Sequence, residues 1–66
     1  MNLLGERMKV KVAFIKNPIN GCIFVRTKEG TGIGWGGTEE EAKAHALRQV
    51  RDDVELEFVT PTELYL

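Results

Sequence analysis

Hydrophobic and polar residues alternate at residues 8–16, where Val10, Val12 and Phe14 share one side and Lys9, Lys11 and Ala13 share the other. A period of two carried by β-branched and aromatic residues is typical of a half-buried strand. The same alternation returns at residues 54–59, with Val54, Leu56 and Phe58 on one face. The pattern therefore predicts a first and a last strand, each with one apolar face.

Turn residues divide the chain between these two strands. Asn20-Gly21 is a strong hairpin signal, and it predicts a second strand over residues 22–27. Gly30 marks the next turn, and a third strand follows at residues 31–35, weakened by its glycines. The first three strands are therefore expected to form antiparallel hairpins.

A helical period replaces the alternation from Glu39 to about Asp52. Its apolar stripe consists of small or branched residues: Ala42, Ala46 and Val50, with Leu47 beside them. Thr38 and Glu41 have the spacing of a capping box, in which the hydroxyl accepts from the Glu41 amide and the carboxylate reaches back to the Thr38 amide. Glu39 and Glu40 place further negative charge at the positive end of the helix dipole.

These elements predict an α+β fold. The expected architecture is an antiparallel sheet in β-β-β-α-β order with one helix packed on one face. Thr60-Pro61 has the form of a cap and first helical residue, which favours one terminal helical turn. Residues 1–7 are interpreted as an N-terminal extension before a second candidate start at Met8, and residues 8–66 as a single domain.

Composition narrows the class of protein. Sixty-six residues lie near the lower limit for folding without a staple, so a partner or self-association is expected. The single cysteine excludes an intrachain disulfide and, with no apolar run long enough for a membrane span, favours a cytoplasmic protein. The net charge of −1 lacks the basic excess of most nucleic-acid binders.

Gly32 to Gly37 match the letters of the dinucleotide fingerprint G-x-G-x-x-G. That fingerprint requires a glycine-rich turn after a buried parallel strand and room for a pyrophosphate at the helix start. Here the glycines lie inside the predicted strand, and the helix opens with three glutamates. We therefore expect no nucleotide cofactor, and we interpret the motif as strand glycines.

Catalytic and metal-binding residues are not evident. His45, the only histidine, is expected to be structural or on the surface, because no nucleophile or acid forms a set with it. Cys22 is expected to be a small buried residue, since one cysteine and one histidine cannot complete a tetrahedral metal site. Successive helical positions turn by about 100°, so the three glutamates do not converge on a metal. The protein is predicted not to be an enzyme.

Trp35 has two interpretations that the sequence leaves open. It either covers the junction of helix and sheet or stands exposed as a contact anchor, a role in which tryptophan is enriched. Four basic residues are predicted to share the sheet face away from the helix: Lys9, Lys11, Lys16 and Arg26. Beside an exposed tryptophan they form a candidate surface for an acidic or nucleic-acid partner.

The segment from Gly34 to Lys43, GWGGTEEEAK, resembles the end of a double-stranded-RNA-binding domain, where the pattern is G-x-G-x-S-K-K-x-A-K. The two adjacent lysines that contact phosphate in that family correspond to Glu39 and Glu40 here, and only Lys43 is retained. The first helix of that domain is also missing. The resemblance implies a βββα core without its RNA-binding surface.

Residues 8–59 resemble more closely the N-terminal domain of HicB-type antitoxins. The strands at 9–15 and 22–27, the Asn20-Gly21 turn and the helix start GTEEEA (37–42) follow that family's order. Its aromatic and Pro-Gly-Cys signature is absent, and no DNA-binding segment follows, so autoregulation is not implied. The resemblance implies a non-catalytic domain that binds a protein, typically a small RNA-cleaving toxin, and oligomerises.

We therefore predict a small protein-interaction module that neutralises a basic partner protein, as a HicB-like antitoxin or a stand-alone inhibitor does. The predicted contact residues are Glu39, Glu40, Trp35 and Lys43, with the sheet edge offered for strand addition. The alternative is a nucleic-acid-binding protein that uses the basic sheet face. No metal, cofactor or membrane contact is expected.

Overall fold

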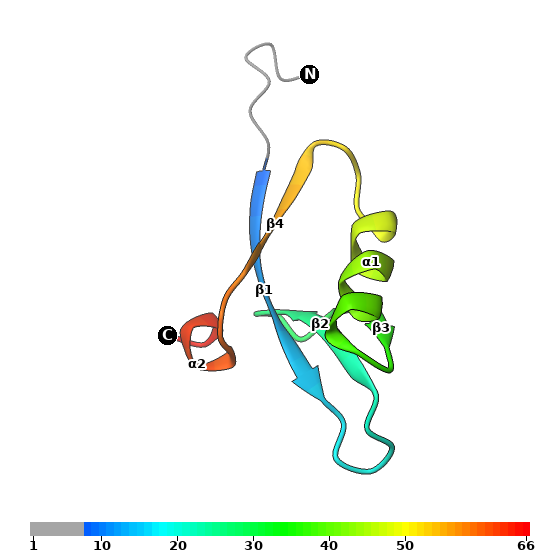
Figure 1. The fold of residues 1–66 in the computed structure, drawn as a ribbon. Coiled ribbons are helices and arrows are strands. Elements are labelled where there is room, and N and C mark those ends of the chain that lie inside the picture. Colours follow the sequence, from blue (N-terminus) through cyan, green and yellow to red (C-terminus); the bar gives the residue numbers. More distant parts are fainter. Residues whose placement is uncertain (1–7) are drawn as a thin grey trace.

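The computed structural model describes residues 8–66, and the predicted extension at residues 1–7 lies outside that range. Four strands form one sheet, and two helices pack against it (Figure 1). The elements in chain order are β1 (Met8–Lys16), β2 (Ile23–Thr27), β3 (Gly32–Gly36), α1 (Glu39–Gln49), β4 (Val54–Phe58) and α2 (Pro61–Leu64). The predicted α+β class is confirmed, and the chain ends in a helix that the predicted β-β-β-α-β order did not count.

The sheet is mixed, so the prediction of an antiparallel sheet is wrong for one pairing. Its strand order is β3-β2-β1-β4, with β1–β2 and β2–β3 antiparallel and β1–β4 parallel. Two hairpins leave β3 running in the direction of β1, and α1 then carries the chain back before β4 begins. A strand that follows such a crossover runs parallel to β1. Alternation identifies a strand but not its direction.

The core lies between α1 and the middle of the sheet. Its fully buried members are Val12, Val25, Ala42 and Ala46. The two alanines allow a close approach, which Gly34 completes: a Cβ on this glycine would lie 2.4 Å from the Ala46 backbone nitrogen. Gly34 and Gly36 therefore pack against α1, and the predicted position of these glycines inside a strand is confirmed.

The helix is shorter than predicted, and its apolar stripe is narrower. It ends at Gln49, with Val50 as an extended C-terminal cap residue that is half-buried. Leu47, placed beside the stripe, is 50% exposed. Because α1 packs mainly on β3 and β2, the sheet covers its other flank less completely.

Helix α2 packs on β1 from the side opposite α1. Leu64 is 2% exposed, and Ala13, whose side chain points away from Val12 and the α1 side, is fully buried. The Thr60 hydroxyl accepts a hydrogen bond from the Glu63 amide at 3.1 Å, and Pro61 occupies the first turn. The predicted terminal helical turn is thus present, and it covers part of the sheet face away from α1.

Candidate functional site

The start of α1 carries three carboxylates with different roles. The Thr38 hydroxyl accepts from the Glu41 amide at 3.2 Å and lies 3.2 Å from Glu41 Oε1, to which it donates. Glu41 therefore bonds to the cap hydroxyl rather than to the predicted Thr38 amide. Glu39 and Glu40 are exposed in the same first turn. The predicted cap is confirmed, and two carboxylates remain directed at solvent.

Trp35 is exposed over 55% of its surface, so it is not a core residue, and its role as a contact anchor stays a prediction. Its side chain leaves β3 on the face opposite α1, and its indole meets the His45 imidazole edge-on, with 4.2 Å between ring centroids and an interplanar angle of 88°. The Trp35 amide donates to His45 Nδ1 at 3.1 Å. The indole is thus held in place while most of it faces solvent.

His45 has a structural role, as predicted. Because Nδ1 accepts from the Trp35 amide, the neutral ring carries its proton on Nε2. Nε2 lies 2.8 Å from the side-chain amide of Gln49, one helical turn later. The structure places the Gln49 amide nitrogen at that distance, and exchanging the nitrogen and oxygen of this amide gives the Nε2–H an acceptor. The histidine therefore links the outer edge of β3 to α1.

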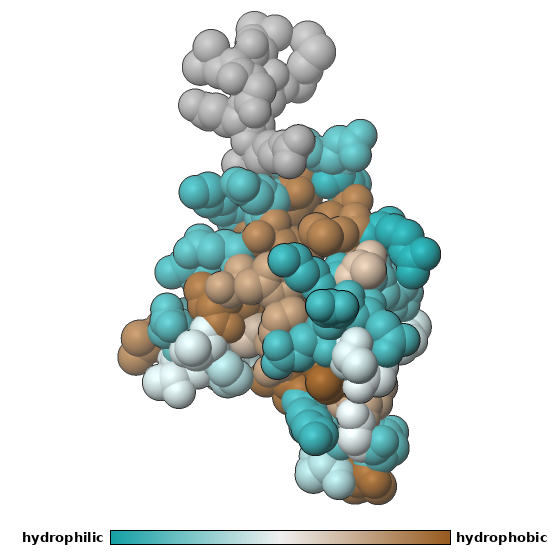
Figure 2. Space-filling view, in the orientation of Figure 1, coloured by the Kyte–Doolittle hydropathy of each residue, from teal (hydrophilic) through white to brown (hydrophobic). Residues whose placement is uncertain are grey.

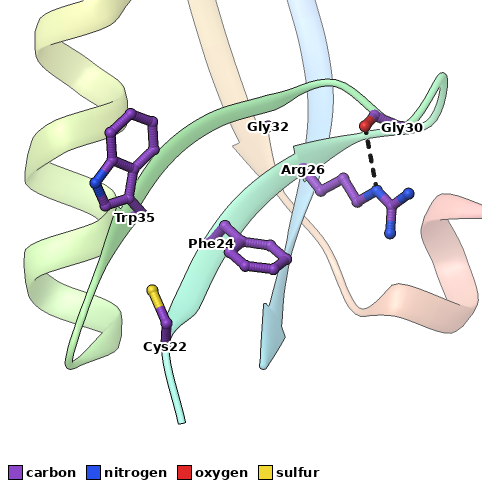
Figure 3. Close-up of a pocket in the computed structure, with 6 residues that line it drawn as sticks. All are labelled: Cys22, Phe24, Arg26, Gly30, Gly32 and Trp35. Atoms are coloured by element: carbon purple, nitrogen blue, oxygen red, sulfur yellow. Dashed lines mark hydrogen bonds between the residues drawn. The ribbon is translucent and has the colours of Figure 1, made fainter. Parts of the chain in front are cut away.

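An open groove lies on the sheet face away from α1 (Figure 3). It encloses about 640 Å³ and is lined by Cys22, Phe24, Arg26, Gly30, Gly32 and Trp35. Phe24 and Trp35 are cross-strand partners of β2 and β3. Arg26 Nε donates to the Gly30 carbonyl at 3.3 Å, which holds the guanidinium at one end of the groove. Cys22 is half-buried at the other end rather than fully buried as predicted.

Lys43 lies on the opposite flank of α1 from Trp35. Its Nζ is 5.3 Å from the centroid of the Phe58 ring, at cation–π distance. The four predicted contact residues therefore do not converge on one pocket. Glu39 and Glu40 occupy the helix start, whereas Trp35 and Lys43 lie on its two flanks.

The predicted basic face is both smaller and less basic than expected. Lys16 lies in register with Ile23 and shares the parity of Val12 and Phe14, so it is on the α1 side of the sheet. Lys9 and Lys11 are the direct partners of Glu55 and Glu57 on β4. Each lysine thus has a carboxylate beside it, and Arg26 lies across the sheet in the groove.

Sequence reasoning missed this pairing of β1 with β4. The alternation VELEF was recognised as a strand, and its two glutamates were visible as its polar side. Their position beside the lysines depends on the parallel pairing, which alternation does not encode. The sequence does contain one signal for it. Lys9 and Lys11 are two residues apart, as are Glu55 and Glu57, so the opposite charges fall side by side when the two strands pair.

Apolar surface is exposed where α1 does not cover β1 and β4 (Figure 2). Met8 is 66% exposed at the start of β1, and Leu47 borders the same region from the helix. Between them lie side chains that are only half-buried: Val10, Val54, Leu56 and Phe58. The sheet therefore has one half covered by a helix and one half partly open.

Metal sites and membrane-spanning helices are the two further features to compare with residues 8–66. Residues 8–66 contain no cluster of three histidine, cysteine or acidic side chains arranged to hold a metal ion. Over the same range, neither helix is long and apolar enough to span a membrane. No known protein family, curated protein or solved structure matches this chain.

Proposed function

We propose that this protein is a small non-catalytic interaction module that binds and neutralises a small basic partner protein, in the manner of a HicB-type antitoxin domain. The observation that carries the proposal is the exposure of the Glu39 and Glu40 carboxylates, which take no part in the helix cap. The helix cap is completed by Thr38 and Glu41, so these two carboxylates are exposed and available to a partner. Their charge attracts a cationic surface and accelerates encounter with it.

Two other features support an interaction module. The indole of Trp35 is held by its contact with His45 and is mostly exposed. It therefore offers a large contact area and loses little side-chain conformational entropy on binding, as hot-spot residues do. Among residues 8–66, four hydrophobic residues are fully buried between α1 and the sheet, and a partner that covers the remaining apolar surface stabilises so small a core. We propose a cytoplasmic location, because a single cysteine fits a reducing compartment, and self-association, because so small a core gains stability when its apolar surface is covered.

The test is a pull-down from the native host with three forms of the chain. The unmodified protein is expected to capture one small basic protein, and the double variant E39K/E40K to lose it. The matched control E29K/D52K changes the net charge by the same amount at exposed positions elsewhere, and it is expected to retain the partner. Equal loss with both variants, or capture of no basic protein, contradicts the proposal.

Nucleic-acid binding is the second candidate, favoured by one specific observation. Phe24, Trp35 and Arg26 line one groove, and aromatic rings beside a guanidinium are the usual elements that stack unpaired bases. Shift assays with single-stranded RNA and DNA at increasing salt test it. Tight binding that weakens steeply with salt and is lost in W35A favours this candidate over the first.

A further inference from the structure

The outer edges of β3 and β4 differ in how far their main chain is bonded or covered by the rest of residues 8–66. On β3, the outward amide of Trp35 is bonded to His45, and α1 packs closely along the strand. On β4, Met8 donates to the Asp53 carbonyl and Val59 donates to the Val12 carbonyl. In a parallel ladder these odd-numbered residues face β1, so the even-numbered ones face outward.

We define the β4 outer edge as the N–H and C=O groups of Leu56 and Phe58 that point away from β1. In the described part of the chain, β4 is the last strand of the sheet on this side. No side chain of residues 8–66 hydrogen-bonds to these groups, in contrast to the bonded amide on β3. An edge of this kind is a template for another strand.

The side chains on the two faces of β4 determine which side chains an added strand needs on each of its own faces. Val54, Leu56 and Phe58 point to the apolar side that α1 leaves partly open, whereas Glu55 and Glu57 are exposed on the other side. On β1, the strand already paired with β4, alternating lysines lie directly beside these glutamates. A strand on the outer edge meets the same alternation of apolar and acidic side chains.

A second copy of the chain does not fit this edge. In an antiparallel pair centred on Leu56, Glu55 of each copy lies opposite Glu57 of the other, which places like charges in direct contact. Shifting the register by two residues brings Glu55 opposite Glu55 or Glu57 opposite Glu57. Each of these arrangements is repulsive, so the glutamates disfavour self-pairing while leaving the edge open to a basic strand.

We propose that the β4 outer edge binds a β-strand of the partner protein, with apolar and basic side chains alternating along it. This inference rests on the proposed function, because it assigns the basic partner's contact segment. The main chain of Leu56 and Phe58 supplies the hydrogen bonds, and Glu55 and Glu57 select lysine or arginine at alternate positions. Strand addition of this type takes affinity from the main chain and specificity from the side chains.

The test uses the full chain, labelled for amide NMR, and two blocked peptides. The basic peptide TKVKVKT is expected to bind and to protect the Leu56 and Phe58 amides from exchange. The acidic peptide TEVEVET, with the same strand propensity at its valines, is expected not to bind. Absence of protection at both amides, or equal binding of the two peptides, overturns the proposal.

Two sets of variants assign the selectivity. E55Q/E57Q removes both charges without placing new cations beside Lys9 and Lys11, and it is expected to weaken the basic peptide about tenfold. E29Q removes an exposed charge in the turn between β2 and β3, and it is expected to leave peptide binding unchanged. Unchanged affinity in E55Q/E57Q, or concentration-dependent protection of the Leu56 amide without peptide, overturns the inference.

The outcomes separate this inference from the proposed function. If the basic peptide protects the edge but no basic protein is captured from the host, the proposed function fails while the edge preference stands. If a basic protein is captured and still binds E55Q/E57Q with full affinity, the proposed function stands and the edge is not its contact.

Discussion

The amide of Trp35 donates a hydrogen bond to Nδ1 of His45, ten residues later in the chain. This hydrogen bond adds to the close packing of β3, the outer strand of the sheet, against α1. It also satisfies a main-chain donor on an edge strand, where unpaired donors invite pairing with other chains. The contact therefore contributes both to the stability of the domain and to the difference between its two edges.

Replacing His45 with alanine is expected to lower the free energy of unfolding by about 1–2 kcal/mol, because the variant loses one hydrogen bond and an aromatic ring contact. Alanine is the better helix former, so helix propensity opposes the loss rather than causing it. Urea unfolding measures the change, and exchange of the Trp35 amide is expected to accelerate. Arg48→Ala, at an exposed position of the same helix, is the control and is expected to change stability by less than about 0.5 kcal/mol. A stability loss in His45→Ala no larger than that of the control contradicts the assigned role.

Replacing Gly34 with alanine is expected to unfold most of the population. The added Cβ would lie 2.4 Å from the Ala46 nitrogen and 2.6 Å from its Cα, and neither backbone atom can move without shifting α1. Overpacking of this kind costs about 3 kcal/mol or more, which approaches the whole stability of so small a domain. Circular dichroism with urea unfolding measures this loss of stability.

Gly32→Ala is the matched control for that experiment. A Cβ at this position has no other described atom within 4 Å. Alanine restricts the unfolded chain, so stability is expected to stay constant or to rise by up to about 1 kcal/mol. Equal destabilisation by the two variants would show that close packing of α1 is not the reason for the glycine at position 34.

Truncating Leu64 to alanine is expected to cost about 2–4 kcal/mol, because the side chain is 2% exposed and its loss leaves a cavity over Ala13. Differential scanning calorimetry measures the shift in melting temperature. Leu66→Ala truncates a side chain that is 87% exposed, and its carbonyl bond to Lys28 does not involve the side chain. That control is expected to have the same melting temperature as the unmodified protein. A similar drop in melting temperature in both variants would contradict the docking of α2 on β1.

Replacing Thr38 with alanine is expected to cost about 1 kcal/mol, because the Glu41 amide loses its acceptor at the helix start. Thr38→Ser keeps the hydroxyl and is expected to recover most of the loss. Urea unfolding of the two variants, with Thr62→Ala as an exposed control in α2, measures the effect. Equal stability of the alanine and serine variants would show that the hydroxyl does not cap α1.

Part of the candidate site followed from local sequence. The pairing of Thr38 with Glu41 depends on residues within one helical turn, so its spacing alone predicts it, and the exposure of Glu39 and Glu40 follows from the cap. The exposure of Trp35 was left open because it depends on His45, which is distant in the chain. The open groove around Phe24 was not predicted, since it requires the register between β2 and β3.

The sequence by itself determined the strands, the helix and its cap, the turns at Gly21 and Gly30, and the apolar side of the first and last strands. These properties arise from interactions between residues close in the chain. Tertiary structure alone decided that β4 runs parallel to β1 and that Lys9 and Lys11 lie beside Glu55 and Glu57. It also decided that His45 accepts from an outward amide of β3, whereas no side chain of residues 8–66 bonds to the outward groups of β4. The physical reason is that strand direction and neighbour choice are set by where α1 packs, and the close contact of Ala46 with Gly34 joins residues that no local pattern relates.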